Sequence, residues 1–135
     1  MWPMGFNYSL ADYHLKPKMP FWWIRASQQP ILFAGENLPD GTVRLHAIND
    51  TLQDVNGLCT LVKVAPDGTE SCLWCKDFRI PANGRCVFQN SQALENGLYL
   101  LDWGFGSNHF LVGEPPFPRD DWRVYRKVLE KRYRP

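Results

Sequence analysis

The sequence has little net charge, few cysteines and no long apolar run. Its 135 residues fit one domain and carry a formal charge of +1, so no strong overall field draws the chain to nucleic acid or to a membrane surface. No apolar segment approaches the roughly 20 residues that a helix needs to span a bilayer. The first residues lack the basic and apolar regions of a signal peptide. We therefore expect neither a nucleic-acid partner nor a membrane partner, and the compartment stays open.

The four cysteines give weak evidence for a metal site or a disulfide. Cys72 and Cys75 form a CxxC pair, but the second ligand pair of a zinc site is missing and the three histidines are scattered. Period-two alternation also predicts that these two thiols point to opposite faces of a strand. Buried or half-buried free thiols are the favoured interpretation, with a disulfide or a metal as alternatives. The sequence indicates no cofactor.

The middle of the chain, residues 30–114, carries the signals of short strands. Residues 42–48 alternate apolar and polar side chains, and Pro66-Asp67-Gly68 is typical of a turn. Crossover helices, which a parallel sheet would need, have no room between these segments. The pattern predicts an all-β, immunoglobulin-like antiparallel β-sandwich of about seven strands. The expected strands cover 30–34, 42–48, 58–64, 71–78, 86–88, 97–103 and 109–112.

Two segments of different composition flank the expected sandwich. Residues 1–29 combine aromatic and basic side chains with several prolines. Residues 115–135 begin with a proline-rich turn and continue with a helical pattern that Asp120 or Asp121 can cap. The apolar positions of this short C-terminal helix recur at spacings of three to four. They are Trp122, Tyr125, Leu129 and Tyr133.

A series of short motifs occupies the first 33 residues in a particular order. They are Trp2-Pro3, Ser9-Leu10-Ala11-Asp12-Tyr13, Leu15-Lys16-Pro17-Lys18, Phe21-Trp22-Trp23 and Pro30-Ile31-Leu32. Their order resembles one stretch of the β-mannosidase-like glycosidases of glycoside hydrolase family 2, where the chain passes from a catalytic (β/α)8 barrel into a C-terminal β-sandwich. The resemblance implies the end of the barrel and a linker or helical segment at 1–29, the sandwich at 30–114, and a proline-rich turn with a terminal helix at 115–135.

The resemblance implies a non-catalytic accessory domain that braces the catalytic (β/α)8 barrel of the same parent chain, or a subunit interface. Family 2 enzymes are retaining glycosidases with two glutamates on the barrel, which would precede residue 1, so no catalytic residue is assigned here. Retaining chemistry needs two carboxyl groups about 5–5.5 Å apart, and nothing in the sequence pairs the glutamates. β-Mannosides are the substrate class that we expect for the parent enzyme, and β-galactosides or β-glucuronides are the next candidates. We expect this chain alone to hydrolyse nothing.

A carbohydrate-binding module is the alternative function. Its candidate sugar-stacking residues are Trp74, Trp103 and Phe105, since such a platform needs exposed aromatic faces beside polar groups. Trp103 follows several leucines in the expected strand 97–103, and Trp74 lies between Leu73 and Cys75, which favours core packing for both. Exposure of these rings therefore separates the two functions. A stand-alone enzyme would need a carboxylate pair or a nucleophile beside a base, and the sequence offers neither.

Overall fold

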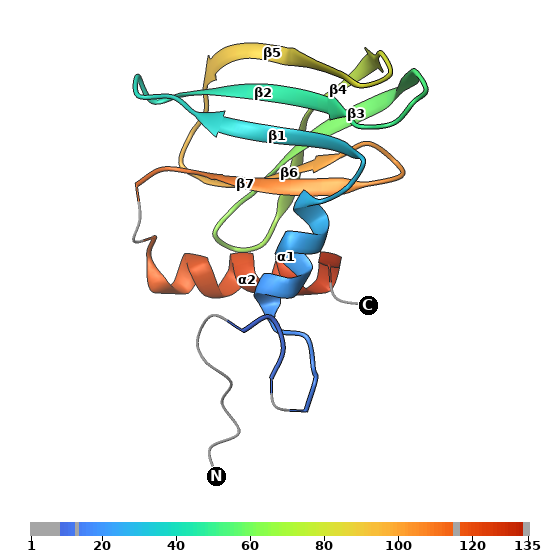
Figure 1. The fold of residues 1–135 in the computed structure, drawn as a ribbon. Helices are drawn as coiled ribbons and strands as arrows, with labels where there is room; N and C mark the ends of the chain where they lie inside the picture. Colours follow the sequence, from blue (N-terminus) through green and yellow to red (C-terminus); the bar gives the residue numbers. More distant parts are fainter. Residues whose placement is uncertain (1–8, 13, 115–116, 134–135) are drawn as a thin grey trace.

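Seven antiparallel strands and two helices make up the regular structure of the chain (Figure 1). The computed structural model describes residues 9–12, 14–114 and 117–133. It confirms the predicted sandwich with one helix before it and one after it. The strands are β1 (Ile31–Asn37), β2 (Thr42–Asn49), β3 (Val55–Val64), β4 (Glu70–Ile80), β5 (Gly84–Ala93), β6 (Gly97–Asp102) and β7 (Ser107–Val112), and the helices are α1 (Met19–Ser27) and α2 (Arg119–Tyr133).

The strands form a three-stranded sheet of order β1-β2-β5 and a four-stranded sheet of order β4-β3-β6-β7. The chain crosses between the sheets three times, and one of these crossings, at residues 81–83, follows the pairing of β4 with β3. Asn83 has a left-handed φ of 47° in this turn, a conformation that asparagine tolerates better than most residues. In immunoglobulin constant domains the fourth strand lies instead beside the fifth. The sandwich is therefore immunoglobulin-like, with its fourth strand in the second sheet.

The fifth strand is much longer than the sequence predicted. The apolar segment 86–88 indicated only part of β5, which runs over Gly84–Ala93. Because β5 is an edge strand, its side chains are exposed or half-buried, and polar residues such as Gln89 and Gln92 occupy strand positions. Edge strands commonly carry polar residues, so an apolar pattern alone underestimates their length.

The molecule has three layers, because the helices cover the outer face of the four-stranded sheet (Figure 1). One apolar core fills the space between the two sheets and includes Tyr99 and Leu101 of β6. A second core lies between the four-stranded sheet and α2, and includes Leu98 and Leu100. Strand β6 is therefore buried on both faces, which explains its nearly continuous apolar sequence.

Helix α2 buries the face that its sequence pattern predicted. Tyr125 and Leu129 are buried against the sheet. The helix begins at Arg119, so the expected capping role of Asp120 or Asp121 is wrong, and both lie in the first turn. Their negative charges are favourable there because the amino end of a helix carries partial positive charge.

Asn49 holds the corner where β2 ends. Its side chain is fully buried, and Nδ2 donates to the carbonyl oxygens of Gln53 at 2.8 Å and Pro81 at 2.9 Å. Its Oδ1 accepts hydrogen bonds from the backbone N–H of Thr51 at 2.9 Å and from the Thr51 hydroxyl at 2.7 Å. The Asn-Asp-Thr sequence is thus explained by a buried polar network that joins the loops at one end of the sandwich.

The cysteines are all free, but three of them are more exposed than the sequence predicted. Cys59 lies in the core, whereas Cys72, Cys75 and Cys86 are exposed. A bulge in β4 pairs Cys72 with Val62 of β3 and Cys75 with Thr60, with one extra residue between them. The expected placement of Cys72 and Cys75 on opposite faces is wrong, since one extra residue reverses the alternation.

No group of three or more His, Cys, Asp or Glu side chains is placed to hold a metal ion within the part of the chain that the structure describes. Neither described helix is long and apolar enough to cross a membrane.

Candidate functional site

The three aromatic residues predicted for sugar stacking lie in different environments. Trp103 is only 2% exposed and its ring centroid lies 5.3 Å from that of Phe33, deep between the sheets. This confirms the expected core packing of Trp103 and leaves it no ring face for a sugar. Phe105, two residues later in the β6–β7 turn, is 59% exposed.

Trp74 lies between these extremes. It is half-buried in β4, where its ring centroid is 5.9 Å from that of Phe88 and Lys76 Nζ lies 4.9 Å above its ring. The ring of Phe105 instead contacts Phe78 at 6.5 Å. The structure therefore does not bring Trp74, Trp103 and Phe105 together on one flat surface, and sugar binding by Trp74 or Phe105 stays a prediction.

The polar residues of the N-terminal motifs contact one another. Asp12 Oδ1 accepts backbone hydrogen bonds from His14 at 2.8 Å and Lys16 at 2.9 Å, and the bond from Lys16 lowers the pKa of the Asp12 carboxyl. Lys18 Nζ donates to Ser9 Oγ at 2.8 Å. These bonds close residues 9–18 into a loop that leads directly into α1. A structural role in shaping this loop accounts for the motif.

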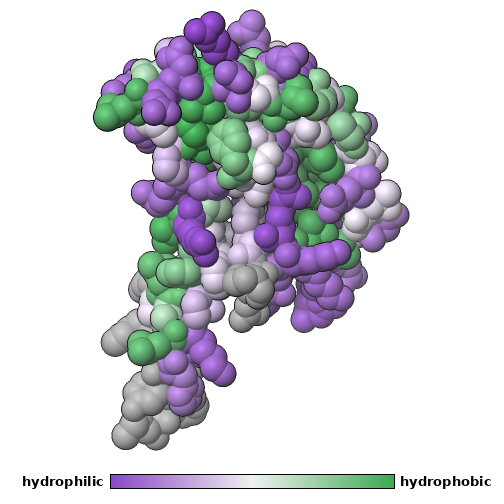
Figure 2. Space-filling view, turned by 90° about the vertical axis from the view of Figure 1, so that its right-hand side faces the viewer, coloured by the Kyte–Doolittle hydropathy of each residue, from purple (hydrophilic) through white to green (hydrophobic). Residues whose placement is uncertain are grey.

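Helix α1 presents aromatic and aliphatic side chains on two sides. On one side Trp23 packs against α2 and β7, with its ring centroid 6.3 Å from Trp122 and 5.7 Å from His109. On the other side Phe21 and Ile24, one turn apart, are 36% and 46% exposed. Figure 2 shows hydrophobic side chains on the lower left of that view, where α1 and the loop before it lie.

We call the exposed side of this region the α1 surface. It consists of Leu10, Phe21 and Ile24, and Leu10 is 40% exposed. The backbone carbonyl of Leu10 accepts a hydrogen bond from the N–H of Lys18, which places it beside the start of α1. The α1 surface is therefore apolar and partly exposed, and it lies where the segment that precedes the sandwich enters α1.

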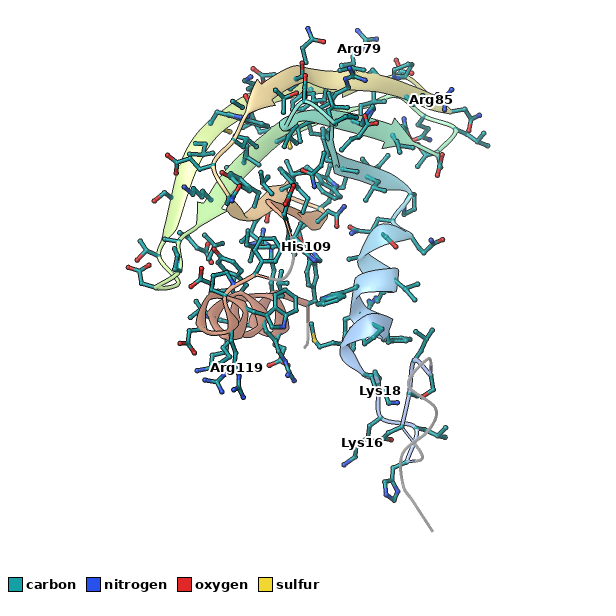
Figure 3. The ribbon with its side chains drawn as sticks, turned by 90° about the vertical axis from the view of Figure 1, so that its left-hand side faces the viewer. Lys16, Lys18, Arg79, Arg85, His109 and Arg119 are labelled. Atoms are coloured by element: carbon teal, nitrogen blue, oxygen red, sulfur yellow. The ribbon has the colours of Figure 1, made fainter. Side chains whose placement is uncertain are left out.

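A cluster of polar groups lies between the four-stranded sheet and the helices. His109 of β7 is located there (Figure 3), and its Nδ1 is 3.0 Å from the Tyr133 hydroxyl of α2. Burial, with a smaller contribution from Arg132, lowers the pKa of His109 to about 4. Burial also raises the pKa of the Tyr133 hydroxyl. At neutral pH both groups are uncharged, and their hydrogen bond fixes the end of α2 to the sheet.

Several carboxylates of the described residues lie beside cations. Glu36 Oε2 is 2.7 Å from His46 Nε2 on the outer face of the three-stranded sheet. Glu130 accepts from Arg126 at 2.9 Å on α2, and Asp102 accepts from Arg132 at 2.5 Å. These pairs are distributed over different elements, which suits a structural role for each.

Sequence reasoning missed the helix–sheet cluster. His109 and Tyr133 lie 24 positions apart, on the consecutive elements β7 and α2, and neither belongs to a recognisable motif. The helical spacing of Tyr133 predicted that it faces the protein, but nothing local indicated which polar partner it meets.

Of the comparisons with known proteins, the one with solved structures yields matches. No family model matches the chain, and no curated protein matches it in sequence. Among solved structures, the fold is similar to part of a β-D-mannosidase from Dictyoglomus thermophilum, with a TM-score of 0.59 and 20% sequence identity. The match covers 78% of this chain and 14% of that enzyme. The chain therefore spans about one seventh of the enzyme that it resembles in fold.

Proposed function

We propose that the chain is a non-catalytic accessory domain of a β-mannosidase-like glycoside hydrolase and braces the catalytic (β/α)8 barrel of the same polypeptide. The observation that carries the proposal is the likeness in fold to a 14% segment of a β-mannosidase. The motif order of residues 2–33 independently resembles the same class of enzymes. Since a fold by itself assigns no function, the agreement of these two observations is what supports the assignment.

The α1 surface is the proposed contact with the barrel. The chain before α1 is where the motif resemblance expects the barrel to end, so a barrel there would lie beside Phe21 and Ile24. Burying apolar side chains contributes about 25 cal/mol per Å². Their exposure here is therefore accounted for if the barrel covers them in the complete polypeptide.

The first test asks whether the chain belongs to a larger glycosidase. An antibody raised against the 135-residue chain should capture from its source cells a longer polypeptide that hydrolyses 4-nitrophenyl β-mannoside. The purified 135-residue chain should show no hydrolysis of the same substrate. Capture of a 135-residue polypeptide alone, or of a longer one without glycosidase activity, would reject the proposal.

The second test addresses bracing. Phe21→Ser combined with Ile24→Ser should lower the melting temperature of the longer polypeptide while its KM for the substrate stays unchanged. The matched control is Leu58→Ser with Leu73→Ser, since these leucines are 55% and 45% exposed on β3 and β4. Equal effects of the two double variants would show that the α1 surface has no special role.

Glycan titration tests the alternative of a carbohydrate-binding module. The bracing proposal expects no saturable response of the chain to manno-oligosaccharides. Saturable binding that is lost in Trp74→Ala or Phe105→Ala, with folding retained, would favour the binding module instead.

A further inference from the structure

A pocket opens where α1 and α2 end. Its volume is about 410 Å³, which lies within the range of roughly 300–1,000 Å³ typical of small-ligand sites. The carboxyl ends of α1 and α2 and the β6–β7 turn lie on one side of the molecule (Figure 1), and Figure 2 views the molecule from that side. Its lining includes Trp22 and Arg25 from α1, Ser107 after the turn, and Arg132 from α2.

The charges around this pocket are unbalanced. Arg25 and Arg132 line it, and the lining includes no Asp or Glu. Arg132 donates to Asp102 at 2.5 Å, so its charge is compensated. The guanidinium of Arg25 lies 5.8 Å from the centroid of the Trp22 ring, and it forms no ion pair with any described carboxylate. One positive charge therefore remains, which matches a ligand with a single negative charge.

Two N–H groups of the pocket lining lack an acceptor. Trp22 Nε1 and Arg132 Nε are buried and have no hydrogen-bond partner among the described residues. The indole N–H groups of Trp23, Trp74 and Trp103 are unpartnered as well, but these residues do not line the pocket. Since buried donors in native proteins are nearly always paired, the two donors of the lining, together with the uncompensated charge of Arg25, indicate a missing acceptor.

One wall of the pocket is held in place by Gln29. Its Nε2 donates to the carbonyl oxygen of Ala26 at 2.7 Å and to that of Ser107 at 2.9 Å. These bonds tie the end of α1 to the start of β7. The pocket thus combines a fixed wall with guanidinium and indole donors, and a preorganised site loses less entropy when a ligand binds.

We infer that this pocket binds a small carboxylate ligand through Arg25, Arg132 and the indole N–H of Trp22. An ionised carboxylate offers only acceptors and one negative charge, and the guanidinium fork is suited to it. The carboxylate comes either from a free ligand of monosaccharide size or less, or from an Asp or Glu of the complete polypeptide. The inference stands on the pocket and does not depend on the proposed function.

The experiment titrates the 135-residue chain with acetate and with D-glucuronate, and follows the indole N–H signals by NMR. Trp22→Phe identifies the signal of Trp22 by its disappearance. We expect that signal to shift saturably in the millimolar range. Arg25→Gln should weaken binding about tenfold, since it removes a charge-assisted hydrogen bond. The control is Arg119→Gln, because Arg119 is exposed at the other end of α2, about 20 Å away.

Three results would overturn the inference. One is the absence of a saturable shift at about 100 mM ligand, a concentration that detects even very weak binding. Another is equal weakening by Arg25→Gln and Arg119→Gln, which would indicate only general attraction of anions. The third is tighter binding of inorganic phosphate than of acetate. An unchanged amide spectrum of Arg25→Gln verifies that this variant is folded.

The same titration of the longer polypeptide distinguishes the two sources of the carboxylate. If the indole N–H signal of Trp22 has the ligand-bound shift before any ligand is added and does not move on titration, the carboxylate belongs to the polypeptide itself. A signal that titrates as in the 135-residue chain assigns it to a free ligand. Both outcomes support a carboxylate site, and neither depends on glycosidase activity.

Discussion

The two faces of β6 are covered in different ways. On the inner face, Tyr99 and Leu101 belong to a core that contains no charged residue and is closed by the opposite sheet. On the outer face, Leu98 and Leu100 are covered by α2, and the rim of that contact includes His109 hydrogen-bonded to Tyr133. The stability of the inner core thus depends on apolar burial. The stability of the contact between β6 and α2 depends in addition on the protonation state of His109. Substitutions on each side should separate these contributions.

The largest effect is expected in the inner core. Trp103→Ala should lower the free energy of unfolding by about 3–5 kcal/mol, since it removes a buried indole and leaves a cavity. The measurement is urea denaturation followed by circular dichroism. Phe105→Ala is the matched control, because this neighbouring aromatic is largely exposed and should cost far less. Similar losses in the two variants would contradict the burial of Trp103.

A smaller and more local effect is expected in the helix layer. Leu129→Ala should cost about 3 kcal/mol, as is typical for a buried leucine, and should loosen α2 more than the sandwich. Amide hydrogen exchange should then become much faster in α2, whereas the exchange rates of amides in β2 and β3 should increase less. Lys127→Ala, on the exposed side of α2, serves as the control. An equal loss of protection throughout the chain would show that the two cores unfold as one unit.

The sequence predicted the inner core better than the helix layer. Alternation in 42–48 predicted nearly the whole of β2 (Thr42–Asn49), because one face of that strand is buried and the other is not. The apolar run at 97–103 indicated that β6 is buried, but a pattern within one strand cannot tell what covers its second face. The edge strand β5 was underestimated because its polar residues follow no apolar period.

The candidate sites were harder still to predict. The core position of Trp103 followed from its leucine neighbours in the sequence. In contrast, Arg25 and Arg132 lie more than one hundred positions apart in the sequence and meet only because α1 and α2 end at the same place. Such a contact depends on tertiary packing and leaves no local signal.

Acid should weaken the helix layer before it affects the inner core. His109 has a pKa of about 4 in the folded chain, against about 6.5 in an unfolded one. The unfolded state therefore binds more protons between these values, so stability is full above pH 6.5 and decreases as pH falls toward 4. The loss is at most about 3 kcal/mol by this linkage.

Urea denaturation at pH 7 and pH 4.5 measures this effect. His109→Phe should reduce the difference between the two pH values. Asp54 has a lowered pKa because of a backbone hydrogen bond from Ala82 and would add acid sensitivity at lower pH, so the comparison with His109→Phe isolates the histidine. An undiminished pH dependence in that variant would exclude His109 as its source.

The smallest effect is expected from the exposed charges of α2. Arg126 Nε donates to Glu130 at 2.9 Å, one turn along the helix, and such exposed pairs contribute about 0.3–0.5 kcal/mol. Arg126→Gln should therefore lower the free energy of unfolding by no more than that amount, and about 1 M salt should abolish the difference because it screens exposed charges. A loss above about 1 kcal/mol would mean that surface ion pairs help to dock α2. A small, salt-sensitive loss would instead assign the docking to the buried side of the helix, where Leu129 and Tyr133 contact the sheet.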